Sequence, residues 1–551
     1  MDAAPPSFRD RLAVDVTLTI GGTTYDLAGG GVRHFSLELH SHGFTGVVEL
    51  VVQDDTAHGG GFEDSLKEPF LGADLVEVSV SVAAVHDQPE VSESPAPIAA
   101  HGIATAKSMR EVLYRRIPDQ PLLVRYYRLE FADPARVLWT QHFPCQLYTD
   151  KTPQSIIEEH KGDKISLRYD WSALTQSKPQ WFLHLPVGLG ASFYDFVVWL
   201  VDGGNAVFSY DYDKAQYAIT ATKAAASSPE ALFGDDIDTA TLLPPIPPRH
   251  VVVVNNSYAT APRSQTVTQD QSATAIRHDH MMRTAISQSV DDAVTAARTR
   301  LALGKYEAQL DFARMPTVGV TPGTAISLSA ANRWNASSAL VSPTWRVRQL
   351  SIEGTMPQLP FDKDVQEAST IYTVQIGARL EQSDDPRVSL PAYRGPAYPG
   401  YVEGKVYSEK GEEGDKTFHT FQHETTSVDE YTVTIPLWED QKVKAPFIPY
   451  QGSGNVYVPS YREERVLVAL WLERAELAQL LEWREGAALS MDVQGEQILL
   501  GKSGTSHTSL SHVYEDDQPV FDVSRKNSSD TSLIRMSEGT LLIQVQEQSE
   551  G

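Results

Sequence analysis

The stretch VDVTLTIGGTTYDLAGGGVRHFSLEL at residues 14–39 carries the pattern that decides the fold. Apolar residues occupy every second position from Val14 to Ile20, which places their side chains on one face of a strand. The pair Gly21-Gly22 supplies the backbone freedom of a tight hairpin turn, and the alternation returns at residues 35–39. Short alternating strands joined by glycine turns predict a β-barrel or a β-sandwich at the start of the chain.

The length of the chain indicates that this barrel is one of several domains. The sequence has 551 residues, more than a single hydrophobic core accommodates. Strand patterns dominate and a short helical region follows residue 150, so the predicted fold class is mainly β with a small α/β insert. The predicted domains, in order, are a first β-barrel (1–149), the α/β insert (150–241), a second β-barrel (242–382), a linker (383–400), a small barrel (401–486) and a strand-rich tail (487–551).

Start signals and proline runs support these boundaries. A helix is predicted from Pro153, which follows a threonine and precedes acidic residues. A second helix is expected over residues 192–201, and a hairpin follows it around the turn at 213–214. LLPPIPP at 242–248 contains four prolines in seven residues, and the segment 383–400 also contains four prolines. Both segments are therefore predicted to be connectors.

Charge and cysteine content limit the classes of function. The chain has 46 Lys and Arg against 72 Asp and Glu, a formal net charge of −26. Such a field repels phosphate backbones, so nucleic acid is not an expected partner. The single cysteine, Cys145, excludes an internal disulfide and metal sites built from several thiolates. Its apolar neighbours predict a buried side chain.

Targeting signals are not visible in the sequence. The first residues, MDAAPPSFRDRL, lack a basic segment followed by an apolar one. The most apolar run, FYDFVVWLV at 193–201, is shorter than the ~18–20 residues of a membrane span. We therefore expect a protein made in the cytoplasm without a signal peptide.

Several polar clusters in the sequence contain residue types that can bind metal ions. His278 and His280 flank Asp279, so both imidazoles would share one face of a strand and could meet one metal ion; a solvated loop explains them more simply. Asp211 and Asp213 lack the remaining ligands of a calcium loop.

Other motif-like segments are also incomplete. His419 and His423 lack the HExxH order of a zinc hydrolase. The segment at 501–503 ends like a phosphate loop but has Glu496 where the leading glycine belongs. The acidic segment at 409–415 is predicted to be an exposed loop. We therefore expect no catalytic residues, no cofactor and no metal site.

Motifs in the first 210 residues resemble those of hub-and-spike proteins of contractile injection machines, a family that includes the VgrG spike of type VI secretion. The segment YRLEF at 127–131 is similar to the family's Y-x-L-x strand, and DKTPQSII at 150–157 is similar to its D-K-T-x-x-x-I-I helix start. Residues 192–200 and 207–210 resemble the aromatic helix and hairpin that follow in this family.

The small barrel and the tail extend this resemblance. VEGKV at 402–406 resembles the opening strand of the family's small barrel, and YTVTIPLW at 431–438 resembles its R-V-x-V-x-x-P/F-W strand. VLVA at 466–469 is similar to its P-x-x-G-D-E-V-L-V strand, although the Gly-Asp pair is Arg462-Glu463 here. QILLGKSG at 497–504 resembles the strand where the spike begins.

The tail predicts association between chains. Its short apolar stretches would bury too little surface for a core in a single chain, whereas intertwined copies would share one core and cover every sheet edge. Oligomerisation follows from the residues, and the resemblance supplies the number three. The residues predicted to pack on the trimer axis are Ile498, Leu500, Phe521, Val523, Leu541, Ile543 and Val545.

The resemblance implies a structural, non-enzymatic trimer: two hub barrels, an OB-like small barrel and a C-terminal intertwined β-prism that acts as a membrane-piercing spike at the end of an inner tube. Its implied partners are a hexameric tube protein, a tip-capping PAAR-like protein, baseplate components and, transiently, the target membrane. The implied location is an assembled injection particle, delivered outside the cell on firing. Two alternatives stay open: a β-rich polysaccharide or cell-wall hydrolase, and a receptor-binding tail protein.

Overall fold

The computed structural model confirms the mainly β fold class. It divides into two compact units, each described by itself. The first unit comprises residues 1–143, 153–176 and 187–396, and the second comprises residues 144–152, 177–186 and 397–551. The structure describes residues 6–27, 29–56, 60–61, 63–85, 96–114, 122–225, 227–273, 275–284, 286–329, 334–356, 367–408, 421–422, 429–446, 462–481, 496–503 and 505–547.

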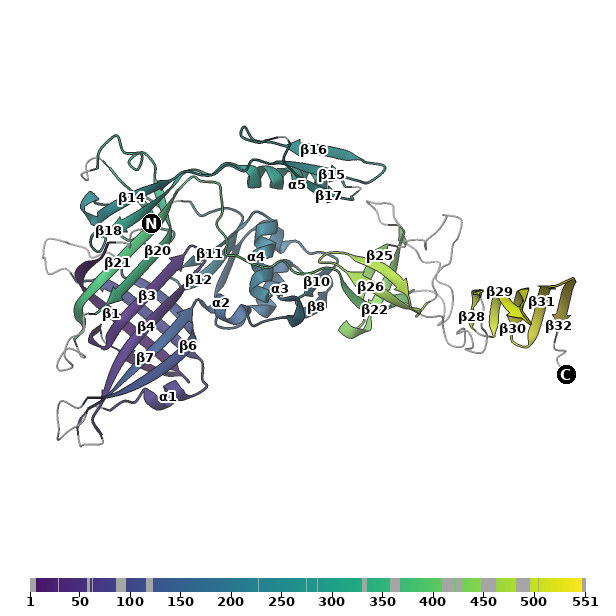
Figure 1. Ribbon diagram of the computed structural model, residues 1–551, viewed down its shortest axis with the longest axis horizontal. Coiled ribbons are helices and arrows are strands. Elements are labelled where there is room, and N and C mark those ends of the chain that lie inside the picture. The colour runs from purple at the N-terminus through teal and green to yellow at the C-terminus, as the bar shows by residue number, and fades with distance from the viewer. Residues whose placement is uncertain are drawn as a thin grey trace. The chain divides into compact units, whose positions relative to one another are not determined.

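A 13-stranded sheet forms the centre of the first unit (Figure 1). Its strands are β1 (Phe8–Ile20), β2 (Thr23–Leu27), β3 (Val32–His40), β4 (Gly43–Asp54), β5 (Val76–Ala84), β6 (Ile98–Tyr114), β7 (Leu122–Ala132), β13 (Glu230–Ala231), β14 (Ile237–Leu243), β18 (Glu307–Phe312), β19 (Ala325–Ser327), β20 (Trp345–Thr355) and β21 (Ser369–Gln382). Pairings run round a closed ring in the order β1-β5-β6-β7-β4-β3-β20-β21, and β21 pairs back to β1. This ring is a barrel, as the opening sequence pattern predicts.

Alternation along the strands builds the interior of this barrel. Side chains at every second position from Val14 to Ile20 are at most 2% exposed, and Phe35, Leu37 and Leu39 are fully buried. The predicted turn at Gly21-Gly22 has φ of 57° and 83°, the left-handed region that glycine adopts without strain.

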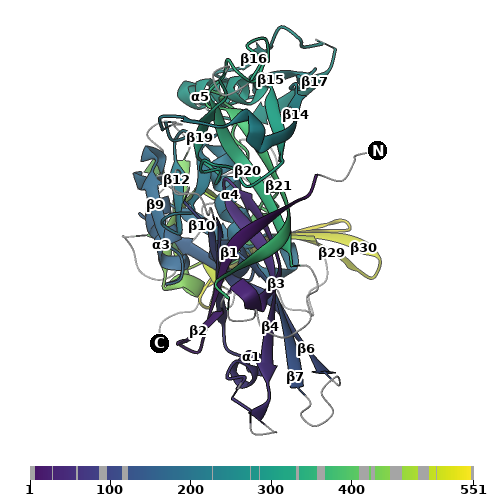
Figure 2. The ribbon, with the colours of Figure 1, turned by 90° about the vertical axis from the view of Figure 1, so that its left-hand side faces the viewer.

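The structure differs from the predicted boundary between two separate barrels at residues 242–382. β20 and β21 belong to the second predicted barrel, yet they complete the ring of the first (Figure 2). The other ends of the same two strands pair with β19 and β18, so both predicted barrels share one sheet. Alternation identifies a strand and its buried face but not its distant partner, which is why the sequence suggested a division here.

The predicted helical insert forms a small α/β layer of the first unit. Its elements, with the helices of the neighbouring segments, are α1 (Lys67–Leu71), α2 (Pro134–Trp139), α3 (Pro153–His160), α4 (Phe193–Gly203), β9 (Leu167–Asp170), β11 (Val207–Asp211) and β12 (Gln216–Thr220). Both predicted helices are confirmed. Ser192 caps α4, and the Asp195 carboxylate accepts a hydrogen bond from the Ser192 backbone in a capping box.

A separate three-stranded sheet with one helix follows β14. Its elements are β15 (Val251–Asn256), β16 (Arg263–Val267), β17 (Arg277–Met282) and α5 (Ser287–Leu301). Val254, Val290 and Val294 are buried between the sheet and α5. The 3-10 helices in the described residues include η1 (Gly29–Gly31), η3 (Ser172–Thr175), η4 (Val187–Leu189), η5 (Gly234–Asp236) and η8 (Pro436–Trp438).

The second unit contains a curved sheet and a terminal meander. The curved sheet consists of β22 (Gly400–Tyr407), β23 (Phe421–Gln422), β24 (Asp429–Ile435), β25 (Gln441–Pro446), β26 (Arg465–Leu470) and β27 (Ala475–Leu480). The meander consists of β28 (Glu496–Ser503), β29 (Ser506–Glu515), β30 (Gln518–Asn527), β31 (Asp530–Ser537) and β32 (Thr540–Gln546), each paired with the next. These two sheets occupy the ranges predicted for the small barrel and the tail.

One hairpin departs from the predicted domain boundaries. β8 (Cys145–Tyr148) and β10 (Trp181–His184) pair with each other, and Leu147 and Phe182 join the core of the curved sheet. The segments 144–152 and 177–186 therefore belong to the second unit, although the sequence places them in the first barrel and the insert. Within the described part of the chain, no helix has the length and hydropathy needed to cross a membrane.

Closure of the barrel generates the first prediction. Gly354 lies directly opposite Phe35 where β20 meets β3, and a Cβ at Gly354 would lie 2.3 Å from the Phe35 ring. Phe35 is fully buried and cannot swing away. We expect Gly354→Ala to lower the free energy of unfolding by about 1–3 kcal/mol, measured by denaturant titration.

Gly203 provides the matched control. It lies in the last turn of α4, and an added Cβ there meets nothing within 4 Å. Gly203→Ala should be neutral or stabilise by up to about 1 kcal/mol. Equal effects of the two substitutions would show that the strand contact at Gly354 is not tightly packed.

Candidate functional site

A continuous apolar row crosses the terminal meander. Residues directly opposite one another on neighbouring strands point to the same face of a sheet. At the centre of the meander, all five such residues are apolar. They are Ile498, Leu510, Val523, Ile534 and Ile543.

Neighbouring rows widen this apolar surface. Leu500 and Val545 lie in the next row on one side, and Phe521, Met536 and Leu541 lie in the next row on the other. We call these ten residues the apolar tail face. All seven residues predicted to pack on a trimer axis belong to it, and their contact with an axis stays a prediction.

Polar residues limit the apolar tail face at its two ends. Thr508, Arg525 and Ser532 complete the row of Leu500 and Val545. Glu496 and His512 complete the row of Phe521, with 3.5 Å between the Glu496 carboxylate and the His512 ring. The apolar character is therefore strongest in the central row.

The apolar tail face is exposed in a single chain. Ile498 is 57% exposed, Leu541 63%, Val545 65% and Ile543 68%. The opposite face is more polar: the hydroxyls of Ser509 and Ser524 hydrogen bond there. A contiguous exposed apolar surface of this kind marks an interaction site.

Sequence reasoning missed part of this face. Leu510, Ile534 and Met536 lie on it but were not among the predicted residues. In β31, Ile534 and Met536 flank Arg535, so the period of two was a usable signal there. In β29, Leu510 has a serine on either side and polar residues two positions away, so no local pattern marks it as part of an apolar face.

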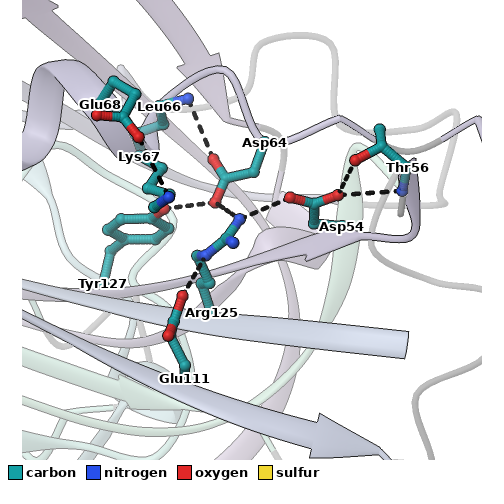
Figure 3. A network of polar contacts seen from close by, with 9 residues as sticks. All are labelled: Asp54, Thr56, Asp64, Leu66, Lys67, Glu68, Glu111, Arg125 and Tyr127. Carbon is teal, nitrogen blue, oxygen red and sulfur yellow. Dashed lines mark hydrogen bonds and ion pairs between the residues drawn. The ribbon is translucent and has the colours of Figure 1, made fainter. Parts of the chain in front are cut away.

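A dense ionic network lies in the first unit (Figure 3). The Arg125 guanidinium on β7 contacts three carboxylates: Nη1 lies 2.8 Å from Asp54 and 3.0 Å from Asp64, and Nε lies 2.9 Å from Glu111. The Tyr127 hydroxyl donates to the same oxygen of Asp64 at 2.5 Å. The Asp64 side chain is fully buried and Arg125 is almost so, so the network ties the segment after β4 to β6 and β7.

Hydrogen bonding and burial shift two acidic groups of this network. The Thr56 hydroxyl first, and the Arg125 guanidinium second, lower the pKa of Asp54 to about 2. Burial, followed by the hydrogen bond to Asp64, raises the pKa of Tyr127. The Asp54 carboxylate is therefore held ionised beside the Arg125 cation, and the Tyr127 hydroxyl keeps its proton, an arrangement that stabilises the packing of these segments.

The histidine pair lies on a strand and not in the solvated loop that the sequence favoured. His278 and His280 are exposed on β17, and the His278 ring stacks on His250 with centroids 3.6 Å apart. Asp279 accepts hydrogen bonds from Arg277 and Asn255. Among the residues described, no group of three or more His, Cys, Asp or Glu could hold a metal ion.

The other polar segments singled out in the sequence have simpler positions. Asp211 accepts hydrogen bonds from the backbone of Asp213 and Lys214, which makes it part of the β11–β12 turn. Residues 501–503 lie in strand β28 rather than in a phosphate loop. His419, His423 and the segment 409–415 lie outside the described residues.

Cys145 corrects one prediction. The structure shows its side chain exposed, not buried. Cys145 begins β8, and the strand enters the core only at Leu147. Apolar neighbours in the sequence therefore did not place the cysteine itself inside.

Comparison with known proteins shows the fold. No protein-family model matches the chain, and no curated protein matches it in sequence. A chain from the solved lidless PdpA–VgrG complex is similar over 98% of this chain and 99% of its own length, with TM-score 0.70 and 11% identity. Chains from the lidded and half-lidded Francisella PdpA–VgrG complexes match 98% of this chain, with TM-scores of 0.69 and 0.68, each at 12% identity and over 80% and 88% of their own lengths. The chain thus has a VgrG-like fold.

The Arg125 network generates the second prediction. Arg125→Met would leave the buried Asp64 carboxylate without its cation, and breaking a buried pair in this way costs about 3–5 kcal/mol. Arg128 on the same strand pairs with Glu49 at 2.7 Å, but both side chains are more than a third exposed. Arg128→Met should therefore cost at most about 1 kcal/mol. Denaturant titration of both variants checks the difference, and equal losses would contradict a structural role for the network.

Proposed function

We propose that this chain is the structural trimeric hub and membrane-piercing spike at the end of the inner tube of a contractile injection system. The observation that carries the proposal is the apolar tail face, which a single chain leaves exposed on a sheet only one layer thick. The VgrG-like fold, which extends over 98% of the chain, supports it.

Association of three copies would bury the apolar tail face that a single meander leaves exposed. Closed cyclic symmetry brings the same row of each copy to one axis, so the central row would meet its two equivalents. The sheets would then share a core that is dry and apolar, with the polar faces directed outward to solvent. A spike of this kind pierces by stiffness and kinetic stability and requires no catalytic group.

The proposed trimer also gives roles to the barrel and to the curved sheet. The barrel strands of three chains would form a six-lobed adaptor for a hexameric tube protein, and an OB-like curved sheet would gather the chains above an intertwined β-prism. A tip-capping PAAR-like protein, baseplate components and, transiently, the target membrane are the proposed partners. We propose that the protein is made in the cytoplasm and leaves the cell only in a fired particle.

Oligomeric mass tests the proposal directly. Light scattering coupled to size exclusion should give three times the mass of one chain at micromolar concentration. Negative-stain images of the same sample should show a three-fold cup with a thin spike. A monomeric mass would exclude both the trimer and the spike.

Substitutions on the two faces of β32 test which surface the copies share. Burying Ile543 contributes roughly 2 kcal/mol per chain, and Ile543→Asp would bring carboxylates together at a dry axis. Gln544 lies on the opposite face, where an added charge stays in water. We expect Ile543→Asp to lower the melting temperature and the trimer fraction, and Gln544→Asp to cost about 0.5 kcal/mol or less. Greater damage from Gln544→Asp would mean that the opposite face forms the interface.

A further inference from the structure

A basic cavity lies in the first unit. Its volume is about 510 Å³, and it is lined by the turn between β3 and β4, by α2, by the first turn of α4, by β20 and by residues 389–392. Among the groups that line it are two imidazoles and two guanidiniums. These are His40, His42, Arg136 and Arg348.

Backbone hydrogen bonds hold the histidine turn in place. Ser41 N donates to the Arg348 carbonyl at 3.0 Å, and the Ser41 carbonyl accepts from Tyr210 N at 2.9 Å. The Tyr212 hydroxyl donates to the carbonyls of His40 and Gly43, each at 2.8 Å. The two imidazoles stack almost parallel, with centroids 5.2 Å apart and 3° between their planes. The wall is therefore built before any ligand arrives, which lowers the entropic cost of binding.

Positive charge in this cavity is not fully paired. Arg348 contacts Glu307 at 2.5 Å, and Arg379 contacts the same carboxylate at 2.6 Å. Glu381 and Arg387 also act electrostatically on Arg348, so three cations face two carboxylates there. Arg136 is exposed and forms no close ion pair among the described residues, but the buried Asp133 carboxylate interacts with it electrostatically. An arginine fork free to bind suits a planar or tetrahedral oxyanion.

Asp195 is the acidic group that lines the same cavity, and its carboxylate is already engaged. One oxygen accepts from Ser192 N at 2.8 Å and from the Ser192 hydroxyl at 2.6 Å. The other accepts from Arg394 N at 2.9 Å. These neutral donors hold the carboxylate at the start of α4 and leave its charge in place, and among the described residues it forms no ion pair with Arg136.

The pKa values of the two histidines reflect their burial and the positive charge of the neighbouring arginines. Burial first, then His40, Arg136 and Arg348, lower the pKa of His42 to about 4. The pKa of His40 is also lowered, by burial first and then by Arg136 and Arg348. Both imidazoles are therefore neutral near pH 7, and a bound anion would favour their protonated forms.

We propose that this cavity is a binding site for a small divalent oxyanion of the sulfate and phosphate class, held by Arg136 and Arg348 and coupled to proton uptake by the stacked pair His40 and His42. Binding adds negative charge between the cations, which raises the pKa of both imidazoles and favours uptake of a proton. The anion should consequently bind more tightly as the pH falls from neutral.

Calorimetric titration of the full-length protein with sodium sulfate tests the site, because sulfate does not itself titrate in this range. Chloride solutions of equal ionic strength serve as the reference at pH 7.5 and pH 5.5. We expect saturable binding of one sulfate per chain, tightened about tenfold at pH 5.5 for one proton taken up. Circular dichroism at both pH values verifies that the protein stays folded.

Three substitutions in the cavity, with a fourth outside it as control, show which side chains bind sulfate. Arg136→Gln should weaken sulfate binding at least about tenfold, whereas Arg136→Lys should retain part of it. His42→Asn should reduce the gain at pH 5.5 more than the affinity at pH 7.5. Arg283 is exposed and does not line the cavity, so Arg283→Gln should leave the affinity unchanged. The absence of saturable heat at both pH values, or equal binding by the Arg136→Gln and Arg283→Gln variants, would overturn the proposal.

The pH dependence of stability gives an independent measure of the same field. A histidine whose pKa is lowered on folding binds a proton in the unfolded state only, between its ordinary pKa near 6.5 and its folded pKa near 4. Its contribution to stability is complete above pH 6.5 and declines as the pH falls toward 4. Sulfate should reverse part of that decline in the unsubstituted protein and not in Arg136→Gln. An equal rescue of both proteins would show that sulfate acts elsewhere.

Discussion

The pairing of β21 with β1 is the contact on which the first unit depends. It joins residues 8–13 to residues 369–374, and it turns an open sheet with two edges into a closed barrel. Without it, β1 and β21 would present unpaired backbone donors and acceptors. The ring also fixes β3, β4 and β20 relative to one another, and the turn that carries His40 and His42 is hydrogen-bonded to β20. The shape of the cavity is therefore a consequence of barrel closure.

The terminal meander, unlike the barrel, is an open sheet. β28 and β32 each have one partner within the described strands, and the more apolar of its two faces is the more exposed. A sheet of this size cannot bury both faces by itself. In the proposed trimer, its stability would come from association between chains, so assembly and folding would be one event for this part of the chain. The barrel is closed within one chain, whereas the proposed core of the tail would form only between chains.

What the sequence could predict depended on how local the signal was. Alternation from Val14 to Ile20 identified the buried face of β1, and the start signals at Pro153 and Ser192 located α3 and α4, because each pattern needs only neighbouring residues. The partner of β21 and the transfer of β8 and β10 to the second unit depend on contacts between distant segments. The Arg125–Asp64 pair joins residues 61 positions apart, and nothing in either neighbourhood points to the other. The apolar tail face was found in outline because strand alternation is local, whereas its continuity across five strands required the register.

Net charge illustrates the same difference between composition and geometry. The chain carries a formal charge of −26, and that total describes its average field in solution. It says nothing about the cavity beside α2, where barrel closure and the α4 cap place Arg136 and Arg348 beside two imidazoles and engage Asp195 elsewhere. An acidic chain can therefore hold a basic pocket, because the local potential depends on which charges the backbone brings within a few ångströms and which of them already have partners.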